Sequence, residues 1–267
     1  MSISAIEPAI PTTTTPVIDQ IHKHNSIRKY KTDPLPVVLI EAIVSAGQRA
    51  ATSSNLQTYA VIAVTDAAKK TEIAHWCGDQ AHIIEAPVFM AWCADLSKLE
   101  RAAQLRQLPH NHEYVESFLV SAIDVALAAQ NAVLAAESLG LGTCYIGGLR
   151  NNTREIIRLL SLPPLVFPLF GLTVGWPAAN PIQRPRLPQQ AILHWEGYTR
   201  EHEDAALLKY DQVMAATGAY NNRQVPVPGK PDAMEDYGWL EHSARRVAQP
   251  LRMELRAVLH EQGFELK

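Results

Sequence analysis

Apolar runs bounded by turn-forming residues predict the secondary structure of the chain up to about residue 200. Short runs rich in β-branched and aromatic residues, typical of strands, fall at residues 59–66, 86–95, 142–148 and 168–177. Helical patterns fall at residues 17–24, 36–51, 67–76, 118–139 and 151–162. Residues 96–114 are more polar and predict a helix and loop on the surface. Strands that alternate with helices indicate a mixed α/β sandwich.

The longest apolar segment, residues 118–139, could be a membrane helix or a buried helix of a soluble protein. Asp124, Gln130, Asn131 and Glu137 interrupt it before about eighteen apolar residues accumulate, so we predict a buried soluble helix. It is apolar nearly all round. We therefore expect the layers of the protein or a second subunit to cover it on most sides.

The composition changes at both ends of the chain. Residues 1–18 hold several prolines and a threonine run with little to bury, which predicts a flexible tail before a domain at 19–200. After residue 200 we predict a helical arm, 201–267. Its parts are an amphipathic helix at 201–217, a proline-bearing crossing segment at 221–239 and a terminal helix at 245–263.

Charge and cysteine usage exclude some classes of partner. The chain has 267 residues and a formal net charge of −3, so no basic field exists to attract nucleic acid or an anionic membrane. Cys77, Cys93 and Cys144 form no CxxC pair, which indicates buried or incidental thiols in a reducing compartment. The first residues lack the basic start and apolar stretch of a secretory signal, so we expect a cytoplasmic protein.

Two short stretches place cationic side chains at alternate positions. In "HNSIRKY" an extended backbone would turn His24, Ser26 and Arg28 to one face, and these three groups suit a phosphate monoester. In "RPR" Arg184 and Arg186 are separated by a stiffening proline. Taken alone, "HNSIRKY" fits better as a helix end followed by solvated polar residues, and "RPR" fits an ordinary basic surface loop as well as a binding segment.

Two further stretches are ambiguous when read alone. "YIGG", residues 145–148, would let the backbone approach a flat ligand, although an ordinary turn has the same sequence. "ATSSN", residues 51–55, is a polar cluster after a helix and could be a simple cap or turn.

Taken together, these stretches resemble the nitroreductase family of FMN-dependent oxidoreductases, and most of all its oxygen-insensitive NADPH nitroreductases and NADPH–flavin oxidoreductases. The resemblance runs from about residue 21 to 267 and includes "HNSIRKY", "ATSSNLQ", "GDQ", "AAQNAVLAAESLGLG", "YIGGLRNN", "LFGLTVGWPAANP", "RPRLP", "NNR" and "LHEQG". It implies an α/β (α+β) fold with a central mixed sheet flanked by helices. It also implies an intertwined homodimer in which the arm wraps the partner and FMN lies at the interface.

The resemblance also implies the residues of an FMN site. The phosphate or flavin edge would be contacted by His24, Ser26, Arg28 and Arg186, with Arg184 near N1 and O2 of the ring. Hydroxyls beside the ribityl chain and ring would come from Thr52, Ser53 and Ser54. Gln80 would hydrogen-bond the pyrimidine edge, and Ile146 would pack below the ring. The backbone of Gly147 and Gly148 would lie near flavin N5. The chain departs from the family pattern at Asn25, Thr143, Cys144 and Arg184.

The implied activity needs no catalytic side chain, because flavin N5 itself accepts the hydride. NADPH would reduce FMN, and a nitroaromatic, a quinone or a free flavin would then take the electrons in a ping-pong reaction. The cations implied near NADPH or the substrate are Arg150, Arg223, Lys230 and Arg252.

Rival functions fit the sequence less well. "GLGTCYIGG" misses the GxGxxG spacing of a dinucleotide fold and follows a predicted helix. No metal is predicted, because neither His75, Cys77 and His82 nor the group around His110 makes a closed ligand set. A flavin-binding protein without turnover, used as a sensor or partner-binding module, would share the FMN residues and stays open as the alternative.

Overall fold

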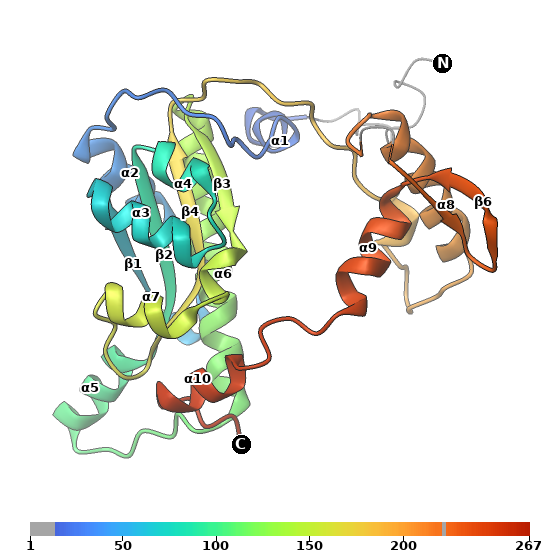
Figure 1. Ribbon diagram of the computed structural model, residues 1–267. Helices are drawn as coiled ribbons and strands as arrows, with labels where there is room; N and C mark the ends of the chain where they lie inside the picture. The colour runs from blue at the N-terminus through green and yellow to red at the C-terminus, as the bar shows by residue number, and fades with distance from the viewer. Residues whose placement is uncertain (1–13, 221–222) are drawn as a thin grey trace. The chain divides into compact units, whose positions relative to one another are not determined.

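The structure is a computed structural model that describes residues 14–220 and 223–267. It divides into two compact units (Figure 1). The sheet unit comprises residues 20–181 and 252–267, and the hairpin unit comprises residues 182–251 with the described residues before residue 20. We predicted a boundary at residue 200; in the structure the chain leaves the sheet unit after residue 181 and returns to it after residue 251.

The sheet unit is built on four strands in the order β1-β2-β4-β3. Their bounds are Tyr59–Val64 for β1, Val88–Asp95 for β2, Gly142–Ile146 for β3 and Val166–Gly175 for β4. We expected a mixed sheet, but all three pairings between these strands are antiparallel. The parallel component among the described residues is limited to an isolated bridge between Ser26 and Thr143.

Strand β2 is buried on both faces, because helices cover both sides of the sheet (Figure 1). Its alternate residues Val88, Met90 and Trp92 join one hydrophobic core with α2 (Val37–Gly47) and α6 (Val115–Ser138). The residues between them, Phe89, Ala91 and Cys93, join a second core with α3 (Ala67–Trp76) and α7 (Thr153–Leu159). The period of two along a strand therefore produces the two cores.

Helix α6 is the long apolar helix that the sequence predicted. It is long and apolar enough to cross a membrane, a test that a core helix also passes, and its small residues around Ala128 and Ala132 are buried against the sheet and α2. The opposite side of the helix is different. An exposed apolar stripe at a spacing of four follows it, made of Val115, Leu119, Ile123 and Leu127.

The last residues of the chain complete the core of the sheet unit. Phe264 is buried and meets the rings of Phe118 and Phe167 edge to face, with centroids 5.6 and 6.2 Å away. The shorter helical elements of this unit are η2 (Ser53–Asn55), α4 (Ala81–Glu85), α5 (Ser97–Arg106), η3 (Gly147–Arg150) and α10 (Leu255–Glu261).

The hairpin unit corrects two predictions. Its elements are η4 (Gln189–Ala191), α8 (Glu203–Ala216), β5 (Gln224–Val227), β6 (Lys230–Asp236) and α9 (Trp239–Ala248). The predicted crossing segment is a β-hairpin that turns at Gly229, whose φ is 75°. The predicted terminal helix is two helices, α9 and α10, because Pro250 removes a donor and disfavours helical backbone at the residue before it.

Helix α1 (Pro16–His22) spans the boundary between the units. This helix begins at Pro16, within the last residues of the tail that we predicted for residues 1–18. Residues 1–13 of that prediction lie outside the described residues.

Candidate functional site

The polar row of "HNSIRKY" runs in an extended conformation beside β3. The backbone N of Ile27 donates to the carbonyl of Thr143 at 2.8 Å, and Ser26 bridges the same residue. Ile27 is buried, whereas Ser26 is half-buried and Arg28 is exposed. The row therefore keeps its serine and arginine accessible while the residue between them joins the protein interior.

His24 is held by a carboxylate at the end of α6. Its Nδ1 lies 2.6 Å from Oε1 of Glu137, whose side chain is only 8% exposed. The ring is therefore fixed through one nitrogen by a buried partner that the sequence reading did not assign to any role.

Arg28 lies beside two titratable groups. Burial raises the pKa of the Cys144 thiol, and the Arg28 guanidinium acts against that rise by its charge and a hydrogen bond. Burial also lowers the pKa of His82, and the charge of Arg28 adds to this effect. Arg28 thus lies near both β3 and α4. Cys144, where the chain departs from the family pattern, contacts Arg28, which we predicted to bind the phosphate.

The serine cluster forms a tight loop. Ser53 and Ser54 lie in η2, and both side chains are exposed, with Thr52 half-buried before them. The backbone N of Ser53 donates to Oδ1 of Asp124 at 3.0 Å. The loop therefore shows hydroxyl groups to the outside while its backbone is tied to α6.

Gln80 and Gly148, distant in the sequence, meet at one point. The Gln80 amide Nε2 donates to the carbonyl of Cys77 at 2.7 Å. A Cβ atom on Gly148 would lie 2.5 Å from that carbonyl oxygen and 2.6 Å from the Gln80 amide, so only glycine fits there. Ile146 is buried just before the glycines. The structure therefore brings together Gln80, Ile146 and Gly148 of the predicted set.

Two predicted cations cluster at Gly147. Arg252 donates from Nη2 to the carbonyl of Gly147 at 2.9 Å and from Nε to Oδ1 of Asn151 at 3.1 Å. Arg150 donates to the carbonyl of Leu169, and burial together with the charge of Arg252 lowers its pKa. The segment 252–267 thus supplies a cation to the edge of the glycine turn.

The remaining predicted cations belong to the hairpin unit. Arg184 and Arg186 are exposed, and Nη1 of Arg186 donates to the carbonyl of Arg184 at 2.9 Å. Arg223 lies over the ring of Tyr237, with 4.1 Å between its Cζ atom and the ring centroid. Lys230 is exposed at the start of β6. All four of these cations belong to the hairpin unit.

Sequence reasoning missed Asp124, Glu137 and Asn151 as parts of this arrangement. The two acids were noticed only as interruptions of an apolar helix. A carboxylate in a helix that is otherwise buried needs hydrogen-bond partners. The presence of an acid in this apolar helix was therefore the one sequence feature that could have indicated a structural role for Asp124 and Glu137.

The residues present in the sheet unit fit FMN. Gly148 keeps its turn free of a side chain where a Cβ atom would press on the Cys77 carbonyl and the Gln80 amide, Arg28 offers an exposed guanidinium, and Ser53 and Ser54 offer exposed hydroxyls. A flat ring, a phosphate and a polyhydroxyl chain require these three kinds of group.

Comparison with known proteins gives a consistent result. Residues 21–176 match the Nitroreductase family, and residues 184–267 match the Nitroreductase family C-terminal domain. The oxygen-insensitive NADPH nitroreductase of Salmonella typhimurium is 35% identical over 94% of this chain and 98% of its own length. An FMN reductase [NAD(P)H] of Bacillus subtilis is 36% identical over 94% of this chain and 98% of its own. The structure of the NADPH:FMN oxidoreductase of Vibrio harveyi complexed with NAD+ superposes with a TM-score of 0.82 at 32% identity, covering 94% of this chain and 99% of that one.

Proposed function

The chain belongs to the nitroreductase family, and on this premise we propose that it is an FMN-dependent oxidoreductase that passes electrons from NADPH to small acceptors. The observation that carries the proposal is the meeting of Gln80 with Gly148, where only glycine fits. A flavin ring needs such an edge, with an amide to pair with its pyrimidine and backbone without side chains beside it.

We assign the FMN contacts by chemistry. Arg28, Ser26 and His24 would hold the phosphate with Arg186, and Arg184 would lie near N1 and O2 of the ring. The hydroxyls of Thr52, Ser53 and Ser54 would meet the ribityl chain and ring, and Ile146, Gly147, Gly148 and Gln80 would border the ring. When bound, FMN supplies a hydride acceptor at N5. The side chains and backbone of the protein therefore have to bind the flavin, orient it and place positive charge near its ring.

The cations at the glycine turn suit a phosphorylated donor. Arg150 and Arg252 lie together at Gly147 and would contact NADPH or the acceptor. Arg223 and Lys230 of the hairpin unit are exposed and would suit the 2′-phosphate of NADPH. Names of relatives support NADPH with flavin or nitro acceptors, and we extend the proposal to quinones.

We also propose that the protein is a cytoplasmic homodimer. The exposed stripe on α6 (Val115, Leu119, Ile123 and Leu127) is an apolar face that a second copy would cover. The three cysteines are free and buried, which agrees with a reducing compartment. Sedimentation should give a dimer for the wild type, and Ile123→Asp should shift it toward the monomer. A wild-type monomer at micromolar concentration would contradict the proposal.

The absorption spectrum of the purified protein tests the central proposal. Held without oxygen, the protein should show a flavin band that bleaches on addition of NADPH and returns when a quinone or nitroaromatic is added. A flavin band that persists would favour a flavin-binding protein without turnover. No band after FMN is supplied would exclude the proposal altogether.

The order of the reaction is testable by steady-state rates. If NADP leaves before the acceptor binds at the same place, initial rates should give parallel double-reciprocal lines. Intersecting lines would contradict the ping-pong reaction.

A further inference from the structure

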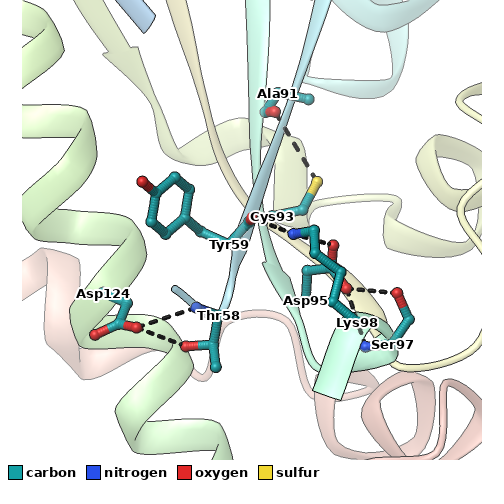
Figure 2. A network of polar contacts seen from close by, with 8 residues as sticks. All are labelled: Thr58, Tyr59, Ala91, Cys93, Asp95, Ser97, Lys98 and Asp124. Carbon is teal, nitrogen blue, oxygen red and sulfur yellow. Dashed lines mark hydrogen bonds and ion pairs between the residues drawn. The ribbon is translucent and has the colours of Figure 1, made fainter. Parts of the chain in front are cut away.

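Asp124 is a buried acid in the middle of α6, with 1% of its surface exposed. Its Oδ1 accepts from the backbone N of Ser53 at 3.0 Å. Its Oδ2 accepts from the backbone N of Thr58 at 3.1 Å and from the Thr58 hydroxyl at 2.8 Å, and Figure 2 shows the carboxylate reaching Thr58. Both oxygens are thus bound to the two ends of one loop, residues 53–58.

The loop between these two attachments has an unfavourable backbone. Ser54, Asn55 and Gln57 have φ angles of 47°, 59° and 53°, and none of them is glycine. L-residues adopt the left-handed region only at a cost, so a loop with three of them keeps its shape when the surroundings hold it. Asp124 holds it at Ser53 and at Thr58.

The same loop carries hydroxyls that Asp124 does not use. Its contact to Ser53 is to the backbone N, and the side chains of Ser53 and Ser54 stay exposed. We propose that Asp124 is a positioning residue for the flavin, which fixes the loop so that Thr52, Ser53 and Ser54 present their hydroxyls in one arrangement. This inference rests on the proposed function.

The other end of the attachment is also fixed. The carbonyl of Thr58 accepts from the backbone N of Asp95, and Lys98 donates to the carbonyl of Tyr59 at 2.7 Å while pairing with Asp95 (Figure 2). Thr58 is therefore a rigid point at the start of β1. A carboxylate bound to it can transmit that rigidity to Ser53.

A purely structural role would make Asp124 equivalent to any other buried residue of α6. Val125, the next residue, is buried in the same core and has no described hydrogen bond to the loop. Val125→Ala is thus a matched control that loosens the helix packing and leaves the attachment of the loop intact.

The test measures flavin affinity separately from stability. The full chain is stripped of flavin, and the Kd values for FMN and for riboflavin, which lacks the phosphate, are measured by quenching of flavin fluorescence. Asp124→Asn should raise both Kd values by the same factor, about tenfold or more, because one amide N–H would face a backbone donor. Thr58→Val, which removes one hydroxyl only, should raise them about threefold. Val125→Ala should lower the thermal midpoint and leave both values within about twofold.

The outcomes separate this inference from the proposed function. If the wild type binds FMN and Asp124→Asn binds it equally well, the inference is wrong and the proposed function stands. An equal loss of affinity in Val125→Ala would reveal general loosening and would also overturn it. If Asp124→Asn does not fold, Thr58→Val decides in the same way. A wild type that binds neither flavin would overturn the proposed function and this inference together.

Discussion

In the sheet unit every residue of β2 is buried, whereas in the hairpin unit α9 has no buried residue along its length. The hairpin unit also exposes large apolar side chains, among them Trp195 at 78% and Val247 at 82%. The first unit buries a hydrophobic core on each face of its sheet. The second unit presents apolar and cationic groups outward, as a binding surface does. The hairpin unit therefore carries large apolar and cationic groups on the outside, whereas the sheet unit holds the two buried cores.

Removal of one aromatic ring from each unit tests whether the sheet unit contributes more to the free energy of unfolding than the hairpin unit. Phe167→Ala in the sheet unit should lower the free energy of unfolding by about 3–5 kcal/mol, because the ring is buried among Phe118 and Phe264. Trp195→Ala in the hairpin unit should change it by less than about 0.5 kcal/mol. Urea unfolding monitored by circular dichroism measures both.

Repeating the unfolding experiment at several protein concentrations tests whether Trp195 lies in a subunit interface. If a partner subunit covers Trp195, the unfolding midpoint of the wild type should rise with protein concentration, and the rise should be smaller in Trp195→Ala. A midpoint independent of concentration in both proteins would place Trp195 outside any subunit interface.

The two arginine stretches test whether both units serve one ligand. Arg28→Ala and Arg186→Ala should each weaken FMN binding by about 1.5–3 kcal/mol, or roughly 10- to 150-fold in Kd, because each removes a charge-assisted pair to the phosphate. The double variant should lose a different amount from the sum if both side chains grip one phosphate. Riboflavin, without a phosphate, is the control and should bind all variants alike. Full FMN retention in both single variants would exclude the phosphate assignment.

One glycine from each unit tests how closely neighbouring atoms pack around the backbone. Gly148→Ala should lower the free energy of unfolding by about 1–3 kcal/mol, because its Cβ atom would press on the Cys77 carbonyl and the Gln80 amide. Gly197→Ala in the hairpin unit meets open space and should change stability by less than about 0.5 kcal/mol. Urea midpoints of the flavin-free chains measure both. Equal midpoints would show that the glycine turn can relax.

The smallest expected effect is a pH dependence. Burial, then the charge of Arg28, lowers the pKa of His82 below 6.5 in the folded protein. The unfolded chain therefore takes up the proton first, and stability should fall as the pH decreases from 6.5 toward the folded pKa. His82→Gln should flatten this part of the curve in urea unfolding at a series of pH values. The same acid slope in both proteins would argue against a half-buried neutral imidazole at residue 82.

The sequence predicts elements well where a local signal marks their ends. Helix α3 was predicted at its observed bounds, and the structure shows a cap at its start, where Asp66 accepts from the backbone N of Lys69 at 2.8 Å. The hairpin lies in the segment that we predicted only as a proline-bearing crossing; Pro226 fits in β5 because proline is tolerated in an edge strand, and both strands of this two-stranded hairpin are edges. The break at Pro250 was missed because the helical pattern continues on both sides of it.

In the candidate site, too, features set by local sequence were predictable, and features set by contacts between distant segments were not. The alternation around Ile27 follows from backbone geometry, so the accessible side chains of Ser26 and Arg28 could be read from spacing. The meeting of Gln80 with Gly148 depends on packing between segments far apart and entered only through the resemblance. The attachment of Ser53 to Asp124 had no local signal beyond a single acid in an apolar helix.

The return of residues 252–267 to the sheet unit has a consequence for proteolysis. Phe264 is buried in the core, and the backbone N of Val115 donates to the carbonyl of Lys267. A single cut within residues 182–251 would therefore yield two fragments that remain associated under native conditions and separate only on a denaturing gel. Fragments expressed separately from either side of such a cut could then reassemble, with the short returning segment as the anchor of the second piece.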